Sequence, residues 1–256
     1  MTHRLTLHNL HIQAGTRTLV QGVDLTVASG ELVALIGASG AGKSLTGRAL
    51  VGMVPFEPGV VDGTVTWTRP DAPDITVSPG PHRTRALAQL RGKGVAWIPQ
   101  DARAALVPVD TVHRQVRAAL RHAGRPHTPA HCAAELSAVG FANPTTVLRQ
   151  YPHTLSGGMA RRVQVALALA LGAAFLMADE PTTGLDRPVQ ARLLQTLAAI
   201  RDRGTGILLI THDLHLVRRH TDRLIVLDQG KVVASGPPSV LDHHPHPAVA
   251  RLRGEP

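Results

Sequence analysis

The chain has 256 residues, of which 43% are hydrophobic and 18% charged, a balance that predicts one large globular domain and excludes a disordered chain. Its net charge of +9 suits contact with nucleic acid, an anionic membrane surface or a polyphosphate ligand. The single cysteine, Cys132, excludes an intrachain disulfide and an all-cysteine metal site, and the longest apolar run, residues 163–178, is too short to cross a bilayer.

The first part of the chain predicts β-strands around one glycine-rich turn. Polar and apolar residues alternate over Arg4–Ile12 and Val23–Val27, as in half-exposed strands. The continuous apolar run Leu32–Ile36 is typical of a strand buried on both faces, and a glycine-rich turn and a helix follow it. Proline and glycine punctuate residues 55–81. Two further strand-like pieces lie in that segment, at Thr64–Thr68 and Ile75–Val77. We expect these outer strands to form an N-terminal antiparallel β subdomain.

Strands and helices alternate along the rest of the chain. Continuous apolar runs predict buried strands at Val95–Ile98, Phe175–Ala178, Ile207–Ile210 and Leu224–Leu227, with Lys231–Ala234 after a turn. Helical patterns begin at Val112 and cover His131–Val139, Gly158–Leu171 and Pro188–Ile200. This alternation predicts an α/β fold with a mixed, largely parallel sheet.

The helical block over residues 101–155 interrupts the alternation, so we interpret it as an inserted α-helical subdomain. Residues 1–100 and 156–240 then form the core with its β subdomain, and the whole chain, 1–256, is one domain. The remaining residues, 241–256, are rich in histidine and proline and are expected to be a loosely ordered tail.

A phosphate-binding motif follows the buried strand Leu32–Ile36. Its residues fit the Walker A pattern: Gly37, Ala38, Ser39, Gly40, Ala41, Gly42, Lys43 and Ser44, with Leu45 next on the helix. Glycines let backbone N–H groups converge on phosphate oxygens, and a helix N-terminus adds positive partial charge. Lys43 is expected to reach the β- and γ-phosphates of a nucleotide and the Ser44 hydroxyl to ligate Mg²⁺. The alternative is an ordinary glycine-rich strand–helix turn.

Two carboxylates end the strand that begins at Phe175. Asp179 is in the Walker B position, where it would hold Mg²⁺ at the carboxyl end of the strand. Glu180 follows directly and can polarise an attacking water as a general base. The alternative is that both residues only begin a solvated loop, and the phosphate motif favours the first interpretation.

Four further segments resemble motifs of the ABC transporter ATPases. Leu155-Ser156-Gly157-Gly158-Met159 resembles the family signature, Gln100 the Q-loop glutamine, Gly184-Leu185-Asp186 the D-loop, and His212 the switch histidine. They stand in the family's order, so the resemblance covers nearly the whole chain. By resemblance the chain is the ATP-hydrolysing subunit of a transporter, with ATP and Mg²⁺ as its ligands.

The resemblance also implies a role for each segment. Two subunits would pair head to tail, so that Ser156, Gly157 and Gly158 face the γ-phosphate of an ATP bound to the other subunit. Gln100 would ligate Mg²⁺, sense the water and signal to a membrane permease, and His212 would hydrogen-bond the γ-phosphate. The alternatives are that His212 is a surface helix cap and that Asp186 is only a helix N-cap.

A narrower resemblance is to the peptide, opine and nickel uptake ATPases. It is carried by Tyr151–Met159, by the stretch from Gln100 to Gln115, and by Ala178–Thr183, while Lys43–Thr46 is most similar to the nickel branch. There are three departures. Gln13–Arg17 lacks the aromatic residue that often stacks on adenine, Arg161 replaces a usual glutamine, and the lone cysteine argues against an iron–sulfur cluster.

These resemblances imply the partners and the location. We expect a second ATPase subunit, a different chain or otherwise a second copy, transmembrane permease subunits, and indirectly an extracytoplasmic substrate-binding protein. The protein would act at the cytoplasmic face of the membrane as a peripheral subunit of a nickel, peptide or metal-chelate importer. The alternatives are an exporter ATPase and a soluble ABC ATPase acting on nucleic acid; with one cassette and no sustained heptads, no nucleic acid is expected.

Two groups of charged residues have open interpretations. Nine basic residues between Arg83 and Arg125 could face anionic lipids or form a solvated face. The histidines of the tail, His243, His244 and His246, could bind a transition metal. The chain has 15 histidines, so the favoured interpretation is that these three lie together by chance.

Overall fold

The computed structural model describes residues 2–80, 83–88 and 90–254. Pro81, the last residue of the segment in which prolines and glycines interrupt the predicted strands, lies outside the described residues. A six-stranded sheet of order β10-β9-β3-β8-β7-β6 forms its centre. Every residue of β3 (Leu32–Ile36), β7 (Phe175–Asp179) and β8 (Gly206–Ile210) is buried, which explains their continuous apolar runs. The strands β6 (Val95–Ile98), β7, β8, β3 and β9 (Arg223–Asp228) are parallel. Only β10 (Lys231–Gly236) is antiparallel to its neighbour among the described strands of this sheet.

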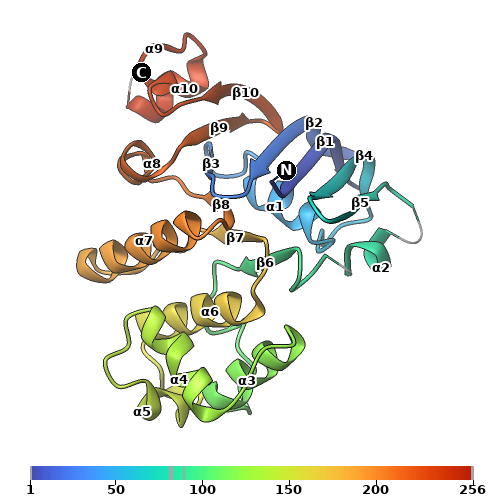
Figure 1. The fold of residues 1–256 in the computed structure, drawn as a ribbon. Helices are drawn as coiled ribbons and strands as arrows, with labels where there is room; N and C mark the ends of the chain where they lie inside the picture. The colour runs from blue at the N-terminus through green and yellow to red at the C-terminus, as the bar shows by residue number, and fades with distance from the viewer. Residues whose placement is uncertain (1, 81–82, 89, 255–256) are drawn as a thin grey trace.

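A second sheet, of order β2-β1-β4-β5, is antiparallel throughout its described pairs. Its strands are β1 (Arg4–Ala14), β2 (Arg17–Ala28), β4 (Pro58–Arg69) and β5 (Ala72–Val77). Helix α1 (Lys43–Leu50) lies between the two sheets (Figure 1). Its buried apolar residues belong to one hydrophobic core that also contains residues of both sheets. The helix approaches the central sheet closely at Gly47, where a Cβ would lie 2.7 Å from Met177 Sδ. The expected α/β fold with an N-terminal antiparallel β subdomain is confirmed.

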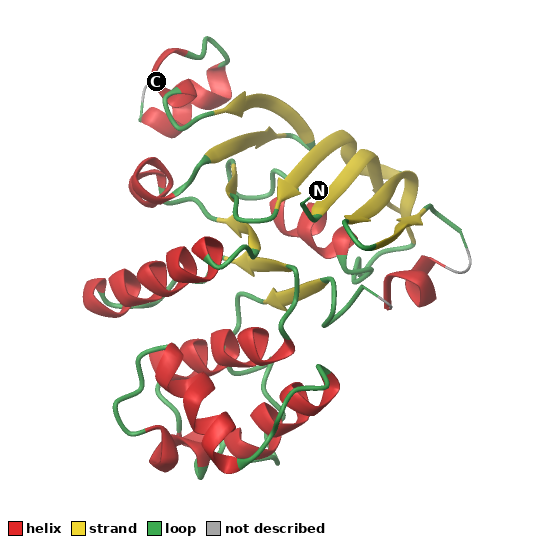
Figure 2. Ribbon diagram, viewed as in Figure 1, coloured by secondary structure: helices red, strands yellow, loops and turns green. Residues whose placement is uncertain are grey.

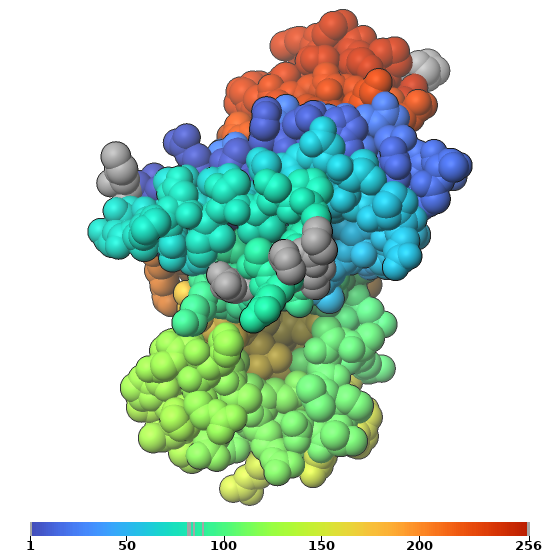
Figure 3. Space-filling model, turned by 90° about the vertical axis from the view of Figure 1, so that its right-hand side faces the viewer, coloured from blue at the N-terminus to red at the C-terminus, as the bar shows by residue number. Residues whose placement is uncertain are grey.

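The predicted helical insert forms a lobe below the central sheet. It contains α3 (Val112–His122) and α4 (Pro129–Ala138), which pack on α6 (Gly157–Leu171), and α5 (Pro144–Leu148), which packs on α4 and α3. Figure 2 shows these helices gathered on one side of the strands, and Figure 3 shows the lobe joined to the rest of the molecule by a narrower waist. The helix starts follow from the sequence: Thr111, Thr128 and Ser156 each accept a hydrogen bond from a first-turn N–H.

The expectation of a loosely ordered tail is wrong. Residues 240–253 form α9 (Val240–His243) and α10 (Pro247–Arg253). Leu241 and Val249 are fully buried against the core around β9 and α8 (Leu214–His220). His246 caps α10 and Pro247 takes its first position, so the residues that suggested disorder instead begin a helix.

The remaining elements connect these parts. They are α2 (Arg83–Ala88), the 3₁₀ turn η1 (Pro152–Thr154) and α7 (Arg187–Asp202). Across the described residues, no helix combines the length and apolar character needed to span a bilayer.

Candidate active site

A cavity of about 720 Å³ opens at the carboxyl ends of β3, β7 and β8. Most of the predicted site residues line it: Gly37, Ala38, Ser39, Gly40, Gly42, Lys43, Ser44, Leu45, Gln100, Glu180 and His212. Ligands of open α/β sheets bind at this edge, because the loops after parallel strands converge there. Segments more than 100 residues apart in sequence therefore meet around one space.

The loop between β3 and α1 has a backbone that favours glycine. Gly37, Gly40 and Gly42 have φ angles of 152°, 79° and 102°, in the region that L side chains rarely adopt. A Cβ on Gly37 would lie 2.1 Å from the Leu227 carbonyl oxygen. The loop is also tied to the β9–β10 turn, since Gly230 N donates to Ala41 O at 3.0 Å. Ala41 is buried, and it is the one residue from Gly37 to Leu45 that does not line the cavity.

Lys43 begins α1 and points back over the loop. Its Nζ donates to Gly37 O and Ala38 O, both at 2.9 Å. Burial lowers the pKa of Lys43, although the nearby carboxylates of Glu180 and Asp179 act in the opposite direction. The ammonium is thus held by uncharged oxygens beside the space that the glycines leave open.

Beside Lys43, the side-chain oxygens of Ser44 and Asp179 lie together and could both ligate a metal ion. Ser44 Oγ donates to Asp179 Oδ1 at 3.0 Å, and Asp179 is only 3% exposed at the end of β7. Burial raises the pKa of Asp179, and the Ser44 hydrogen bond partly offsets this. Hydroxyl and carboxylate oxygens at one point match the preference of Mg²⁺ for hard oxygen ligands.

Glu180 faces the cavity from a strained backbone. Its φ is +46°, an uncommon value for a residue with a side chain. Thr183 Oγ1 donates to its Oε2 at 2.9 Å, and His212 Nδ1 lies 3.1 Å from its Oε1. Burial tends to raise the pKa of Glu180, but the hydrogen bonds from His212 and Thr183 outweigh it, so the net pKa is lowered. Glu180 is therefore ionised at neutral pH.

The structure shows which of two residues, His212 and Asp186, caps a helix. Asp213, not His212, caps α8, because its Oδ1 accepts from Leu216 N at 3.1 Å, so the helix-cap alternative for His212 is wrong. Asp186 does cap α7, since its Oδ1 accepts from Val189 N at 2.9 Å.

The signature segment lies apart from the phosphate cavity. Ser156 caps α6, accepting from Met159 N at 3.2 Å, and a Cβ on Gly158 would lie 3.3 Å from Val189 Cγ1 of α7. Gly157 borders a second cavity, of about 970 Å³, between the helical lobe and the central sheet. Gln100 lines both cavities. The chain thus does not bring Ser156, Gly157 and Gly158 to its own phosphate loop.

Two residues of this site were missed in the sequence analysis. Thr183 holds Glu180, and its spacing of three residues from a carboxylate in a turn is a recognisable signal. Leu252 of α10 lines the phosphate cavity, and nothing in its local sequence indicates this. Metal binding was the less favoured interpretation of the tail histidines, and no group of three or more His, Cys, Asp or Glu suited to a metal occurs among the residues placed by the structure.

The family model of the ABC transporter matches residues 20–183, which is more than half of the chain. The chain belongs to the ABC transporter family. It is 39% identical over 238 residues to the nickel import ATP-binding protein NikD of Rhodospirillum rubrum, covering 91% of this chain and 86% of that protein. It is 38% identical to the oligopeptide transport ATP-binding protein OppD of Mycobacterium tuberculosis over 85% of this chain, but spans only 35% of that relative.

Solved structures agree with the family's fold. An ATP-binding subunit of an ABC transporter has a TM-score of 0.75 and 25% sequence identity, covering 98% of this chain and 93% of that one. A dimeric post-hydrolysis state of an ATP-binding cassette with ADP and Pi has a TM-score of 0.75 and 23% identity over 91% of this chain and 98% of that chain. The predicted ABC family, in its nickel and peptide group, is confirmed by these relatives.

Proposed function

We propose that this chain is the ATP-hydrolysing subunit of an ABC importer for nickel, a peptide or a metal chelate. The observation that supports this best is the meeting of Lys43, Ser44 and Glu180 around one cavity beside a glycine loop. The buried Asp179 lies directly behind this lining, where it accepts the hydrogen bond of Ser44. The names of the nickel and oligopeptide import relatives support the importer class and leave the cargo open between those two.

The phosphates of ATP would lie against the loop from Gly37 to Ser44. Backbone N–H groups and the N-terminus of α1 would meet their negative charge, and the Lys43 ammonium would exchange its two carbonyl partners for phosphate oxygens. The backbone N–H groups that would bind the phosphates include those of Ala38, Ser39, Ala41 and Leu45.

Ser44 and Asp179 fit a magnesium ion, with Gln100 reaching the same cavity. When bound, Mg²⁺ would neutralise phosphate charge. Glu180 would take the proton of an attacking water, and its lowered pKa keeps it in the basic form at neutral pH. His212, beside Glu180, would orient that carboxylate and donate to the γ-phosphate.

The position of Gly157, away from the phosphate cavity, supports a two-subunit site. Ser156, Gly157 and Gly158 at the N-terminus of α6 would then meet the γ-phosphate held by another ATPase subunit, a different chain in our proposal and otherwise a second copy. The pair would bind transmembrane permease subunits as a peripheral complex at the cytoplasmic face, and an extracytoplasmic binding protein would deliver the cargo.

ATP binding by the purified chain, and ATP hydrolysis once the partner ATPase subunit is added, test the proposal. Lys43→Ala should weaken ATP binding at least about tenfold, because each hydrogen bond to a charged group contributes about 1.5–3 kcal/mol. Lys93→Ala is the matched control: Lys93 is exposed and precedes β6 at the opposite end of the sheet strands. Unchanged binding and hydrolysis in Lys43→Ala would exclude the assigned site, and purification without a permease but with salt-sensitive RNA would contradict transport.

A further inference from the structure

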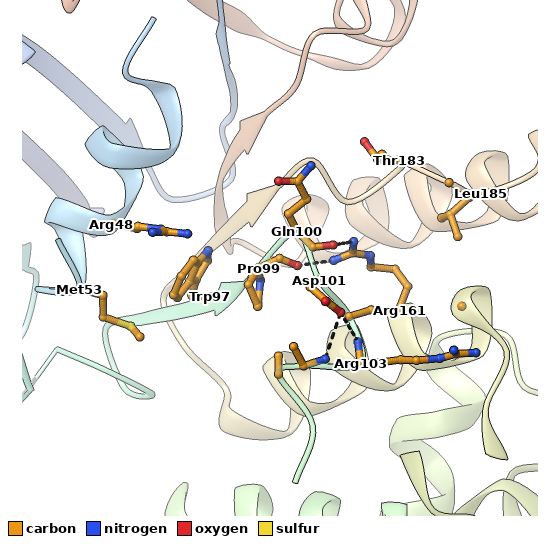
Figure 4. A pocket seen from close by; sticks show the side chains of 15 residues that line it. Arg48, Met53, Trp97, Pro99, Gln100, Asp101, Arg103, Arg161, Thr183 and Leu185 are labelled. Atoms are coloured by element: carbon orange, nitrogen blue, oxygen red, sulfur yellow. Dashed lines mark hydrogen bonds between the residues drawn. The ribbon is translucent and has the colours of Figure 1, made fainter. Parts of the chain in front are cut away.

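The buried guanidinium of Arg161 joins the signature helix to the loop that carries Gln100. Arg161 is 3% exposed and lies on α6, one turn after Gly158. Its Nη1 donates to Pro99 O and to Gln164 Oε1, the latter at 3.1 Å, and its Nη2 donates to Gln100 O. Figure 4 shows the guanidinium directed at the main chain of both loop residues.

The partners of Arg161 are all uncharged oxygens. A buried cation without a contacting carboxylate is costly to desolvate, and the cost is offset only if its donors are well satisfied. Burial lowers the pKa of Arg161, which is consistent with this environment. A neutral glutamine, usual in the resembling group, would be cheaper to bury but could not reach two successive carbonyls with a rigid fork of donors.

A second contact runs in the opposite direction between the same two segments. Arg103 Nη2 donates to Leu155 O at 2.7 Å, directly before Ser156. Asp101 Oδ1 stiffens the loop by accepting from Arg103 N and Ala104 N, both at 3.0 Å. We call residues 99–103 the Gln100 loop. It is thus tied to α6 near both ends of the segment 155–161.

We infer that Arg161 is a positioning residue that makes the Gln100 loop and the signature helix move as one body. The inference rests on the proposed function, in which Gln100 serves the nucleotide of its own chain and Ser156–Gly158 serve that of another subunit. A displacement of α6 on binding the second nucleotide would then move Gln100 at the first. Arg161 is not among the residues that line the phosphate cavity, so it would act there only through the Gln100 loop.

Arg162 provides a matched control for this inference. It is the next residue of α6, burial lowers its pKa as well, and it donates to Gly140 O at 3.0 Å. Its guanidinium also lies 4.2 Å from the centre of the Phe141 ring. These contacts stay within the helical lobe, so Arg162→Met should disturb packing without touching the Gln100 loop.

The experiment compares Arg161→Met, Arg161→Lys and Arg162→Met in the full chain, together with its partner ATPase subunit for the rate measurements. We measure Mg-ATP hydrolysis, the Mg²⁺ concentration that gives half the maximal rate, and the fluorescence response of Trp97 to Mg-ATP in a Trp67→Phe background. Trp97 lies in β6, three residues before Gln100, and is the one remaining tryptophan in that background. It reports on the loop independently of turnover.

Arg161→Met should lower the rate and raise the half-saturating Mg²⁺ concentration by about tenfold each, as supporting contacts of a metal site typically do. It should also shrink the Trp97 response, with partial recovery in Arg161→Lys, while Arg162→Met stays near wild type. If Arg161→Met does not fold, Arg161→Lys against Arg162→Lys gives the same comparison. Equal Mg²⁺ dependence and Trp97 responses in the Arg161 and Arg162 variants would overturn the inference, whereas a wild-type chain that does not bind Mg-ATP would refute the proposed function instead.

Discussion

Adding one methyl group to Gly37 should open the phosphate loop. The Cβ of an alanine at this position would lie 2.1 Å from Leu227 O and 3.3 Å from Ala41 Cβ. The first neighbour is a backbone atom of β9, which is held in the sheet, so it cannot rotate away as a side chain could. The φ of 152° is an additional strain for alanine.

The two effects together give the expected magnitude. Overpacking of this kind costs about 1–3 kcal/mol, and an unfavourable backbone conformation costs about another 1–3 kcal/mol. Gly37→Ala should therefore lower the free energy of unfolding by about 2–6 kcal/mol, a large share of the roughly 5–15 kcal/mol of a typical domain. If the phosphate loop moves to relieve part of this strain, the loss of stability will be smaller and ATP binding will be weaker instead.

Gly40→Ala is the control for this prediction. Gly40 also has a positive φ, of 79°, but no atom lies within 4 Å of a Cβ placed there. Only the backbone strain of about 1–2 kcal/mol then remains. Denaturant unfolding and ATP titration of both variants test the reasoning, and equal unfolding midpoints for the two would refute it.

Three further predictions concern the site and the tail. Glu180→Gln should bind ATP like the wild type and trap the closed two-subunit complex. It should hydrolyse ATP at least about 100-fold more slowly, since a general base typically accelerates a reaction by about 10²–10⁴-fold. Turnover near the wild-type rate, measured by phosphate release, would exclude Glu180 as the base. Burial raises the pKa of Asp179, so any stability it contributes is present at low pH and lost as pH rises through its folded pKa. Asp179→Asn should accordingly stabilise the nucleotide-free protein near pH 7, and Mg²⁺ should no longer strengthen ATP binding. A melting temperature that changes with pH as it does in the wild type would contradict this. Val249→Ala should lower the free energy of unfolding by about 1–3 kcal/mol, and calorimetry showing no change would mean that α10 does not pack on the core.

The central sheet and the phosphate loop could be predicted because their sequence signals are local. A strand buried on both faces needs a run such as Leu32–Ile36, and the loop after it needs its glycines and lysine. The tail could not be predicted, because Leu241 and Val249 stand in short apolar groups that are separated by histidines and prolines. Their burial depends on a surface made by β9 and α8, which is a tertiary property.

In the site, too, local motifs could be predicted from the sequence, whereas contacts between distant segments could not. The motif residues could be identified one by one, but the contact of His212 with Glu180 joins the ends of two strands and has no signature in either segment. Arg161 is a similar case. Its sequence marks it only as a departure from a resembling group, and its role depends on the Gln100 loop passing beneath α6.

The two bonds from Lys43 to the loop's own carbonyls have a consequence for which anions the protein retains. These bonds occupy two of the three N–H donors of the ammonium, so an incoming ligand must displace them to engage more than one donor. A lone phosphate ion offers little in exchange, whereas a chain of phosphates can engage several amides of the loop at once and repay the displacement. Free orthophosphate should therefore be a poor competitor, and the subunit should shed its inorganic product readily even where that ion is abundant.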